Sequence, residues 1–507
     1  MNRLLIFVLC LFWALGGQAQ STDWPTFVKD SLDAYVERAL QGWPIPGIAI
    51  GVVKGQELIL AKGYGVLEAG KPEKVDANTL FMIGSNTKAF TGTLLAMLAE
   101  EGKCQLDDRV DAWLPEFDMK DDWVEQQVTL SDLVCHRLGM ETFQGDFTYW
   151  TSNLSQREVL AHFGRFTPKY DFRTQWGYCN AGFLIAGLCM EPISGQTWDA
   201  LIEERLFQPL GMDRSIALSA NLSKATNAAK PHTLVEGQLQ HLPIPMIDNL
   251  APAGSISSSI NDMSHWVMAH LNGGRYQDKQ VIPEGAIQAT RTPLSIIGRS
   301  QHPFNNSHYN LYGMGWVLED YEGREIVSHT GGVNGFVTSV TLVPEEELGI
   351  IVLTNTDQNG FFEALKWEIL DAYLGLPYRD YNGVFLQGTI ENEANMADWR
   401  AKIRDTISMK LPTDAPLSAF AGRYQNDAYG DLSFVNKGDY LEGHFAHHSM
   451  TAKLEPLGGE RFLCSFSDPT FGMRTVWFEV QDGQVQSFTL RVASFVEFTT
   501  YEFVKLE

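Results

Sequence analysis

The sequence has few basic residues for its length, and this shortage limits the partners that it can bind. It contains 38 Lys and Arg against 62 Asp and Glu, which gives a formal net charge of -24 at pH 7. A surface of this sign repels phosphate backbones and anionic lipid headgroups. We therefore expect no nucleic-acid partner, and no feature of the sequence indicates an oligomeric state.

Long hydrophobic runs are absent beyond the first residues. Leu4 to Leu15 form an apolar run after Arg3, and Gly17-Gln18-Ala19 offers a small-x-small cleavage site. This pattern predicts a secretory signal peptide over residues 1–19, because the run is too short to remain in a bilayer. We expect a periplasmic or secreted protein with no stable membrane insertion.

Cysteine is also scarce. After Cys10 leaves with the leader, the remaining cysteines are odd in number and form no C-x-x-C pair. Such spacing does not suggest a disulfide framework, and a chain of 507 residues does not need disulfide bonds to stabilise its fold. We expect buried free thiols at Cys104, Cys135, Cys179, Cys189 and Cys464.

The periodicity of apolar residues predicts an α+β domain over residues 20–385. A helical pattern and a β-hairpin come first, mostly helical patterns follow between about 105 and 275, and period-two strands appear beyond about 310. We expect an antiparallel sheet that uses both ends of this segment, flanked by helices and a helical subdomain. The predicted late strands are 312–317, 325–328, 336–342 and 350–354, followed by a helix over 361–374.

The last quarter of the chain has a different pattern. Charged residues over 386–412 predict a polar helical linker. Short alternating segments separated by turn residues over 413–507 predict a small all-β barrel or sandwich. No internal repeat or low-complexity tract interrupts this order.

The most informative stretch is Gly84-Ser85-Asn86-Thr87-Lys88, which leads into an apolar pattern of helical spacing. We expect an amphipathic helix with Ser85 at its start, where serine is a favoured cap. Lys88 lies one turn further on the same face. A hydroxyl, an ammonium and unpaired N–H groups would thus meet at a helix N-terminus, whose partial positive charge favours an oxyanion.

Two interpretations of this stretch compete. Ser85 is either an activated nucleophile or a capping serine beside a solvated lysine, which is the usual meaning of an isolated Ser-x-x-Lys. This is the only Ser-x-x-Lys in the chain, and candidate partners follow it. Tyr178-Cys179-Asn180 precedes a predicted helix, and His329-Thr330-Gly331-Gly332 follows a predicted strand. No Gly-x-Ser-x-Gly surrounds Ser85, which argues against an α/β-hydrolase triad.

The three motifs in this order resemble those of the class C β-lactamase and penicillin-recognising serine hydrolase superfamily, and its peptidase and esterase branch looks closest. The resemblance covers about residues 25–375. Phe420-Ala421-Gly422-Arg423-Tyr424, which opens the tail, is similar to the lipocalin-like domain attached to some of these hydrolases. The resemblance implies the β-lactamase/transpeptidase-like fold.

It also implies roles for the motif residues. Ser85 would attack an acyl carbon, its own N–H and that of Gly332 would form the oxyanion hole, and Tyr178 would accept the proton. A phenol of pKa near 10 needs a shift of about three units, or roughly 4 kcal/mol, to act at neutral pH. One ammonium about 4 Å away supplies ~4 kcal/mol at an effective dielectric of about 20. Neutral Lys88 as the base needs a similar shift, so the two groups form one coupled titration.

The remaining motif residues would hold the substrate. Asn180 would orient Lys88 and the substrate amide, and His329, Thr330 and Gly331 would bind the substrate. His329 stands where lactamases have lysine, and imidazole is mostly neutral at pH 7, so its hold on a substrate carboxylate weakens. This departure disfavours β-lactams and favours peptides, amides or esters.

We expect an exported serine hydrolase that acts on a small molecule or peptide with no metal or organic cofactor. The alternatives are a β-lactamase, a penicillin-binding sensor that does not turn over, and a tail that serves as the binding module. His444, His447 and His448 could suggest a metal site, but without a Cys or carboxylate partner a polar strand face is the better interpretation. His136 is interpreted as a packed structural histidine.

Overall fold

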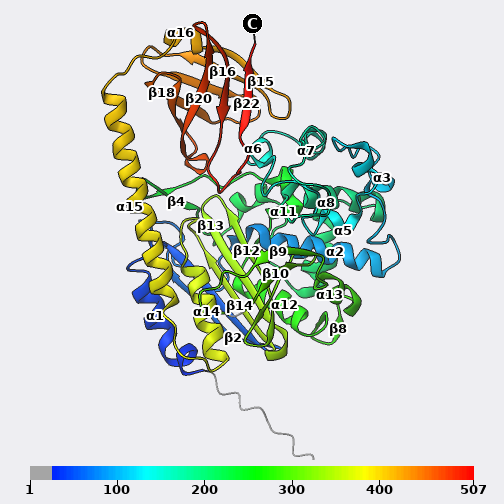
Figure 1. Ribbon diagram of the computed structural model, residues 1–507. Coiled ribbons are helices and arrows are strands. Elements are labelled where there is room, and N and C mark those ends of the chain that lie inside the picture. Colours follow the sequence, from blue (N-terminus) through cyan, green and yellow to red (C-terminus); the bar gives the residue numbers. More distant parts are fainter. Residues whose placement is uncertain (1–24, 306, 507) are drawn as a thin grey trace, which may run out of the picture.

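The structure, a computed structural model, describes residues 25–305 and 307–506, so the predicted signal peptide lies outside the described residues. Its centre is an eight-stranded antiparallel sheet of order β2-β1-β14-β13-β12-β11-β10-β9 (Figure 1). The first strands pair with the last, since β1 lies between β2 and β14. The predicted sheet built from both ends of the segment is therefore confirmed. The strands are β1 (Gly47–Lys54), β2 (Glu57–Gly65), β9 (Ser295–Arg299), β10 (Tyr309–Tyr312), β11 (Val317–Tyr321), β12 (Arg324–Val333), β13 (Phe336–Val343) and β14 (Leu348–Thr354).

Both faces of this sheet are covered, which explains why β1 is buried along almost its whole length. Ile48, Ile50 and Val52 belong to the core shared with α1 (Leu32–Ala39) and α14 (Phe361–Tyr373). Ala49 and Val53 point the other way, into the core shared with α2 (Thr87–Glu100) and α12 (Ile260–Leu271). The alternation places one residue in each core in turn, as a pleated strand requires.

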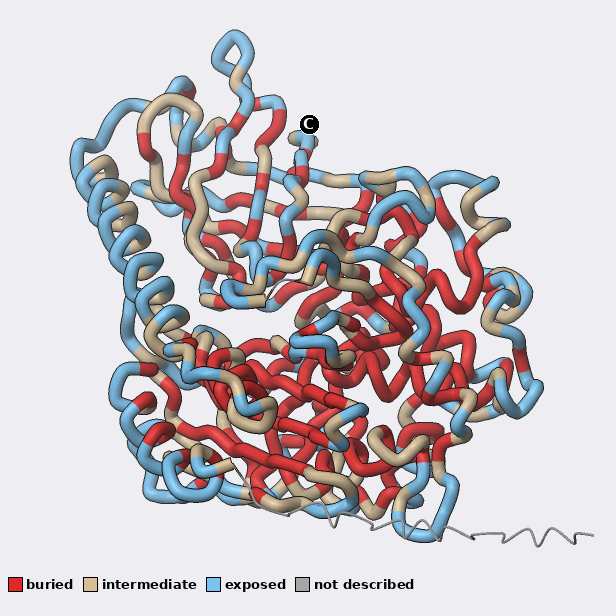
Figure 2. The backbone as a smooth tube through the Cα atoms, turned by 60° about the horizontal axis from the view of Figure 1, so that its bottom comes forward, coloured by how far each residue is buried: buried red, intermediate tan, exposed pale blue. Residues whose placement is uncertain are grey.

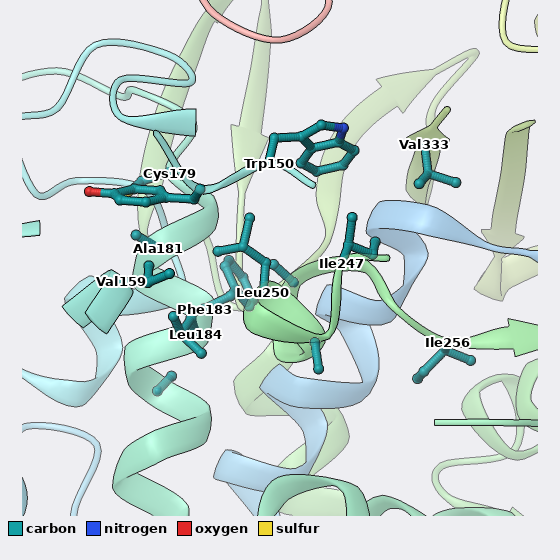
Figure 3. Close-up of a cluster of buried hydrophobic side chains, with 14 of the residues drawn as sticks. Trp150, Val159, Cys179, Ala181, Phe183, Leu184, Ile247, Leu250, Ile256 and Val333 are labelled. Carbon is teal, nitrogen blue, oxygen red and sulfur yellow. The ribbon is translucent and has the colours of Figure 1, made fainter. Parts of the chain in front are cut away.

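The helical subdomain packs around α2. This helix contacts α8 (Asn180–Ser194) and α11 (Ala251–Gly254), and Figure 3 shows Phe183 and Leu184 of α8 among the buried side chains there. The further helices are α3 (Val110–Trp113), α4 (Asp122–Glu125), α5 (Leu130–Leu133), α6 (Asp146–Tyr149), α7 (Gln156–Phe163), α9 (Trp198–Ile202), α10 (Gln208–Leu210) and α13 (Glu284–Thr290).

The expectation of an amphipathic α2 is wrong. Every residue from Thr87 to Leu98 is buried. Thr91 tolerates burial because neighbouring elements satisfy its hydroxyl, which donates to the Pro252 carbonyl at 2.7 Å and accepts from the Trp198 indole at 2.9 Å.

The predicted strand over 312–317 is also wrong, because two strands meet there. β10 ends at Tyr312 and β11 begins at Val317. Gly315 between them has φ +87°, and a Cβ at this position would lie 2.5 Å from the Lys88 carbonyl oxygen. The turn brings the chain against α2 at a point that only glycine fits.

The C-terminal segment forms a closed eight-stranded barrel, as the turn-rich alternation predicts. The helix α15 (Tyr381–Ser408) leads to it along one side of the molecule (Figure 1) and is mostly exposed (Figure 2). It begins earlier than the charge pattern indicates, because Asp380 caps it by accepting the Gly383 N–H at 2.9 Å. The barrel comprises β15 (Gly422–Asn426), β16 (Gly430–Asn436), β17 (Leu441–Phe445), β18 (Thr451–Gly458), β19 (Arg461–Phe466), β20 (Met473–Gln481), β21 (Gln484–Leu490) and β22 (Tyr501–Lys505), and α16 (Leu417–Phe420) precedes it.

The described residues show two further features. The five cysteines from Cys104 to Cys464 are buried free thiols, as predicted. No helix in these ranges is both long enough and apolar enough to span a bilayer.

Candidate active site

Ser85 lies in a short 3-10 turn, Gly84–Asn86, directly before α2. It does not cap the helix as predicted: Asn86 is the residue at the cap position, and no side chain makes a capping hydrogen bond there. Hydrogen bonds with Thr338 of the central sheet hold the turn in place instead. The Thr338 hydroxyl of β13 donates to the Ile83 carbonyl at 2.8 Å and accepts from the Asn86 amide at 2.9 Å. This anchoring leaves the Ser85 hydroxyl free to face the cavity that it lines.

Lys88 is completely buried, and three hydrogen-bond acceptors surround its side-chain nitrogen. Nζ donates to Ser85 Oγ at 3.2 Å, to Asn180 Oδ1 at 2.6 Å and to the Ala253 carbonyl at 2.7 Å. Burial lowers the pKa of Lys88 to about 7, and the Asp146 charge offsets only part of this effect. The structure therefore brings together the predicted serine, lysine and asparagine, with an amine that is partly neutral at pH 7.

Tyr178 also lies beside Lys88. Its ring centroid lies 4.7 Å from Lys88 Nζ, within the range of a cation–π contact. Burial raises the pKa of Tyr178, and a hydrogen bond with Ser85 lowers it by a smaller amount. His136 packs against the tyrosine ring, with the two ring centroids 4.2 Å apart. Its Nδ1 also accepts the Cys179 N–H at 2.9 Å. His136 is thus the packed histidine that the sequence suggests.

The third motif lies on β12, beside the serine turn. A Cβ on Gly84 would lie 2.9 Å from the Gly332 nitrogen, and one on Gly331 would lie 1.8 Å from the Ile83 carbonyl oxygen. The two backbones can approach this closely only without side chains. Gly332 and Thr330 line the same cavity as Ser85.

His329 also lines this cavity, but both of its ring nitrogens are already engaged. Nδ1 donates to the Thr330 carbonyl at 2.6 Å, and Nε2 accepts from the Tyr312 hydroxyl at 3.0 Å. Burial and the charge of Lys88 lower the pKa of His329 to about 3. The imidazole is therefore neutral and has no spare donor for a substrate carboxylate.

The cavity has a volume of about 220 Å³, and five of its lining residues were not predicted from the sequence. They are Phe143, Asp146, Trp150, Phe495 and Val496. Asp146 accepts a hydrogen bond from Asn180 Nδ2 at 2.5 Å, which extends the chain that begins at Lys88. The first three belong to irregular or very short elements without a periodic pattern, so the sequence offered no sign of them.

The last two come from the C-terminal segment, between β21 and β22. Glu497 follows them and is buried against the α+β domain, where it accepts the backbone N–H groups of Gly145 at 2.9 Å and Phe147 at 2.7 Å. Phe498 stacks on Phe143 with ring centroids 5.9 Å apart. Phe495 and Val496 therefore form one wall of the cavity, and Glu497 holds the start of α6, which carries Asp146.

The three barrel histidines do not share one environment. His444 is exposed on β17, whereas His448 is buried between the barrel and the α+β domain. His448 donates to the Trp150 carbonyl at 3.0 Å and accepts from Tyr429 at 2.9 Å. The predicted polar strand face is thus wrong for His448. Among the described residues, no group of three His, Cys, Asp or Glu side chains could hold a metal ion.

An antiparallel sheet flanked by helices, with a serine and a lysine where the helical subdomain meets the sheet, defines the class of β-lactamase and transpeptidase folds. A model described as Beta-lactamase matches residues 32–374, and the chain belongs to that family. A second model, described as a domain of unknown function, matches residues 408–505.

Curated and solved relatives agree with this assignment. The unguisins hydrolase ungD of Aspergillus violaceofuscus is 28% identical over 452 residues, which cover 83% of this chain and 78% of the relative. The octameric penicillin-binding protein homologue from Pyrococcus abyssi has a TM-score of 0.61 at 21% identity and covers 94% of this chain and 99% of that one. A D-stereospecific amidohydrolase from Streptomyces sp. has a TM-score of 0.54 at 19% identity, over 67% and 98% of the chains. The two structures show a shared fold, and the family with its hydrolase relatives supports a serine hydrolase.

Proposed function

We propose that this chain cleaves amide or ester bonds through an acyl-enzyme on Ser85. The observation that carries the proposal is the hydrogen bond of 3.2 Å between Lys88 Nζ and Ser85 Oγ, made by a lysine whose pKa burial lowers to about 7. A buried, partly neutral amine in contact with a hydroxyl is the arrangement that activates a serine nucleophile.

Lys88 is the better candidate for the base than Tyr178. Burial lowers the pKa of the amine toward neutrality but raises that of the phenol, so the neutral amine is far more populated than the phenolate. Asn180 and the Ala253 carbonyl hold the amine in place. Tyr178, beside Lys88, is then placed to pass a proton to the leaving group.

The reaction proceeds in two halves. As Ser85 Oγ bonds to the carbonyl carbon, its proton moves to Lys88, and the Ser85 and Gly332 N–H groups stabilise the oxyanion. The intermediate collapses by expelling an amine or alcohol, which takes the proton. Water then attacks the acyl-serine, releases the carboxylic acid and returns the proton to Ser85. Thr330, which lines the cavity, presents β12 to the substrate, and Gly331 allows this strand to pack against the serine turn.

Amides and esters are favoured over β-lactams because His329 is neutral and fully hydrogen-bonded, so the cavity offers a β-lactam carboxylate little hold. The relative from Aspergillus violaceofuscus is named an unguisins hydrolase, which supports a hydrolytic reaction.

A fluorophosphonate probe tests the nucleophile directly. The wild type should be labelled and Ser85→Ala should not, whereas Ser223→Ala, which removes an exposed hydroxyl, should label normally. A panel of p-nitrophenyl esters, aminoacyl p-nitroanilides and nitrocefin then ranks the substrates. Absence of labelling in the folded wild type would end the proposal, and rapid turnover of nitrocefin alone would favour a β-lactamase.

Export is proposed on the basis of the leader pattern in residues 1–19. N-terminal sequencing of the protein recovered from the periplasm or medium should find a chain that begins near residue 20. A full-length chain retained in the cytoplasm would contradict export without bearing on the chemistry.

A further inference from the structure

Asp146 is the acidic side chain in the cavity, and the catalytic steps above do not use it. It is only 3% exposed and lines the same cavity as Ser85. One carboxylate oxygen, Oδ2, accepts the Asn180 amide at 2.5 Å. No hydrogen bond from a described residue reaches its other oxygen, Oδ1. This oxygen is open to the cavity that Asp146 lines, so a substrate group bound there can donate a hydrogen bond to it.

The surroundings of Asp146 favour a cation as that partner. Burial, and then the neighbouring Glu497, raise the pKa of Asp146, and the Asn180 hydrogen bond and the Lys88 charge offset only part of this effect. The cavity is lined by no Lys or Arg among the described residues, and Lys88 is fully buried behind Ser85. A substrate ammonium would supply the missing charge at this end.

The other walls fit a small cationic group. Phe143, Trp150 and Phe495 present aromatic rings to the cavity, and ring faces attract ammonium groups. The Trp150 indole N–H is already bound to Asn334 at 2.7 Å, so this residue offers the substrate chiefly its ring. A volume of about 220 Å³ suits a group of the size of one amino acid.

On the basis of the proposed acyl-enzyme function, we propose that Asp146 binds a free ammonium next to the scissile carbonyl, so that the preferred acyl donor is an aminoacyl amide or ester. A charged hydrogen bond of this kind corresponds to a preference of about ten- to 100-fold over the same substrate without the amine. Asp146 is therefore a specificity-determining residue, and substrates with a blocked amine are disfavoured.

Matched substrates test this assignment. Alanine p-nitroanilide, as both enantiomers, and propionyl p-nitroanilide differ only in the ammonium. In the wild type, kcat/KM for one alanine enantiomer should exceed kcat/KM for propionyl p-nitroanilide by about ten- to 100-fold. Asp146→Asn should reduce this ratio of alanyl to propionyl substrate at least about tenfold. The variant keeps an acceptor for the Asn180 amide. Asp439→Asn, which removes the same charge from an exposed barrel turn, should leave the ratio unchanged.

The outcomes separate the two proposals. If Asp146 only positions Asn180, both substrates slow equally in Asp146→Asn and the ratio stays constant, which overturns the specificity role while Ser85 remains labelled by fluorophosphonate. Loss of all labelling in the wild type overturns the acyl-enzyme function itself. Should Asp146→Asn not fold, protection of wild-type Ser85 from labelling decides: alaninamide must protect at lower concentration than propionamide, and equal or weaker protection overturns the inference.

Discussion

Glu497 of the barrel accepts the backbone N–H of Phe147 at 2.7 Å, which joins two residues 350 positions apart in the sequence. Its carboxylate also accepts from Tyr501 at 2.8 Å. Phe147 belongs to the short helix that begins with Asp146, so this contact couples the placement of the cavity acid to the docking of the C-terminal segment. The barrel is thereby part of the site's architecture.

Replacing Glu497 by Gln should weaken both the fold and the activity. Gln has one acceptor oxygen in place of two, so one of the buried N–H groups loses its partner, at a cost of about 1.5–3 kcal/mol in the free energy of unfolding. Urea denaturation measures this loss, and kcat/KM on an aminoacyl substrate should fall in parallel. Glu502→Gln, at an exposed position on β22, is the matched control. Equal stability of the two variants would show that the Glu497 contact contributes nothing.

Part of the candidate site could be predicted from the sequence. Ser85, Lys88 and Asn180 could be predicted because the motifs that carry them, in that order, resemble those of a known family, and the structure brings the three side chains within hydrogen-bond distance. Asp146 and Glu497 could not be predicted, because each occupies an irregular segment whose position depends on how two distant parts of the chain dock. Periodicity carries no information about such contacts.

The errors in the fold have the same origin. The α2 helix was expected to have a polar face, yet its threonines are buried, and the hydroxyl of Thr91 finds hydrogen-bond partners on neighbouring elements. The run from Tyr312 to Val317 alternates like a strand, but the close approach of Gly315 to the Lys88 carbonyl imposes a turn. In both cases tertiary contacts override a local pattern.

The rate of Ser85 acylation should rise with pH up to about 7 and then level off. Only the neutral amine can accept the serine proton, and burial lowers the pKa of Lys88 to about 7, so each pH unit below that value reduces the neutral fraction about tenfold. The pH dependence of the fluorophosphonate labelling rate measures this. Lys88→Arg, whose guanidinium stays protonated, should label at least about 100-fold more slowly at every pH. A rate that keeps rising toward pH 10 would assign the base role to Tyr178.

His329→Lys should increase reactivity toward β-lactams. The native imidazole is neutral, with a pKa lowered to about 3, and both nitrogens are engaged, whereas an ammonium could reach a substrate carboxylate. A charged hydrogen bond predicts about a tenfold or greater rise in the rate of nitrocefin acylation. His329→Gln adds no charge and should not show it, and thermal melting verifies that both variants fold. Unchanged acylation in a folded His329→Lys would mean that the third motif does not face the carboxylate.

Neighbouring glycines on β12 should differ in how strongly the same substitution destabilises the fold. In Gly331→Ala the new Cβ would lie 1.8 Å from the Ile83 carbonyl oxygen and 2.5 Å from Thr338 Oγ1, so the strand and the serine turn must separate. Overpacking of this kind costs about 1–3 kcal/mol in the free energy of unfolding, and the displaced turn should also slow labelling of Ser85.

Gly332→Ala is the matched control, because its Cβ would meet only the Phe495 ring, at 3.4 Å, and its backbone N–H is retained. It should keep nearly the wild-type melting temperature, whereas Gly331→Ala should melt several degrees lower, at about 2–4 °C per kcal/mol for a domain of this size. Differential scanning calorimetry with fluorophosphonate labelling distinguishes the two variants. Equal melting temperatures would show that the contact between β12 and the Ser85 turn can relax without cost. The close packing of these two segments would then not be the reason for glycine at position 331.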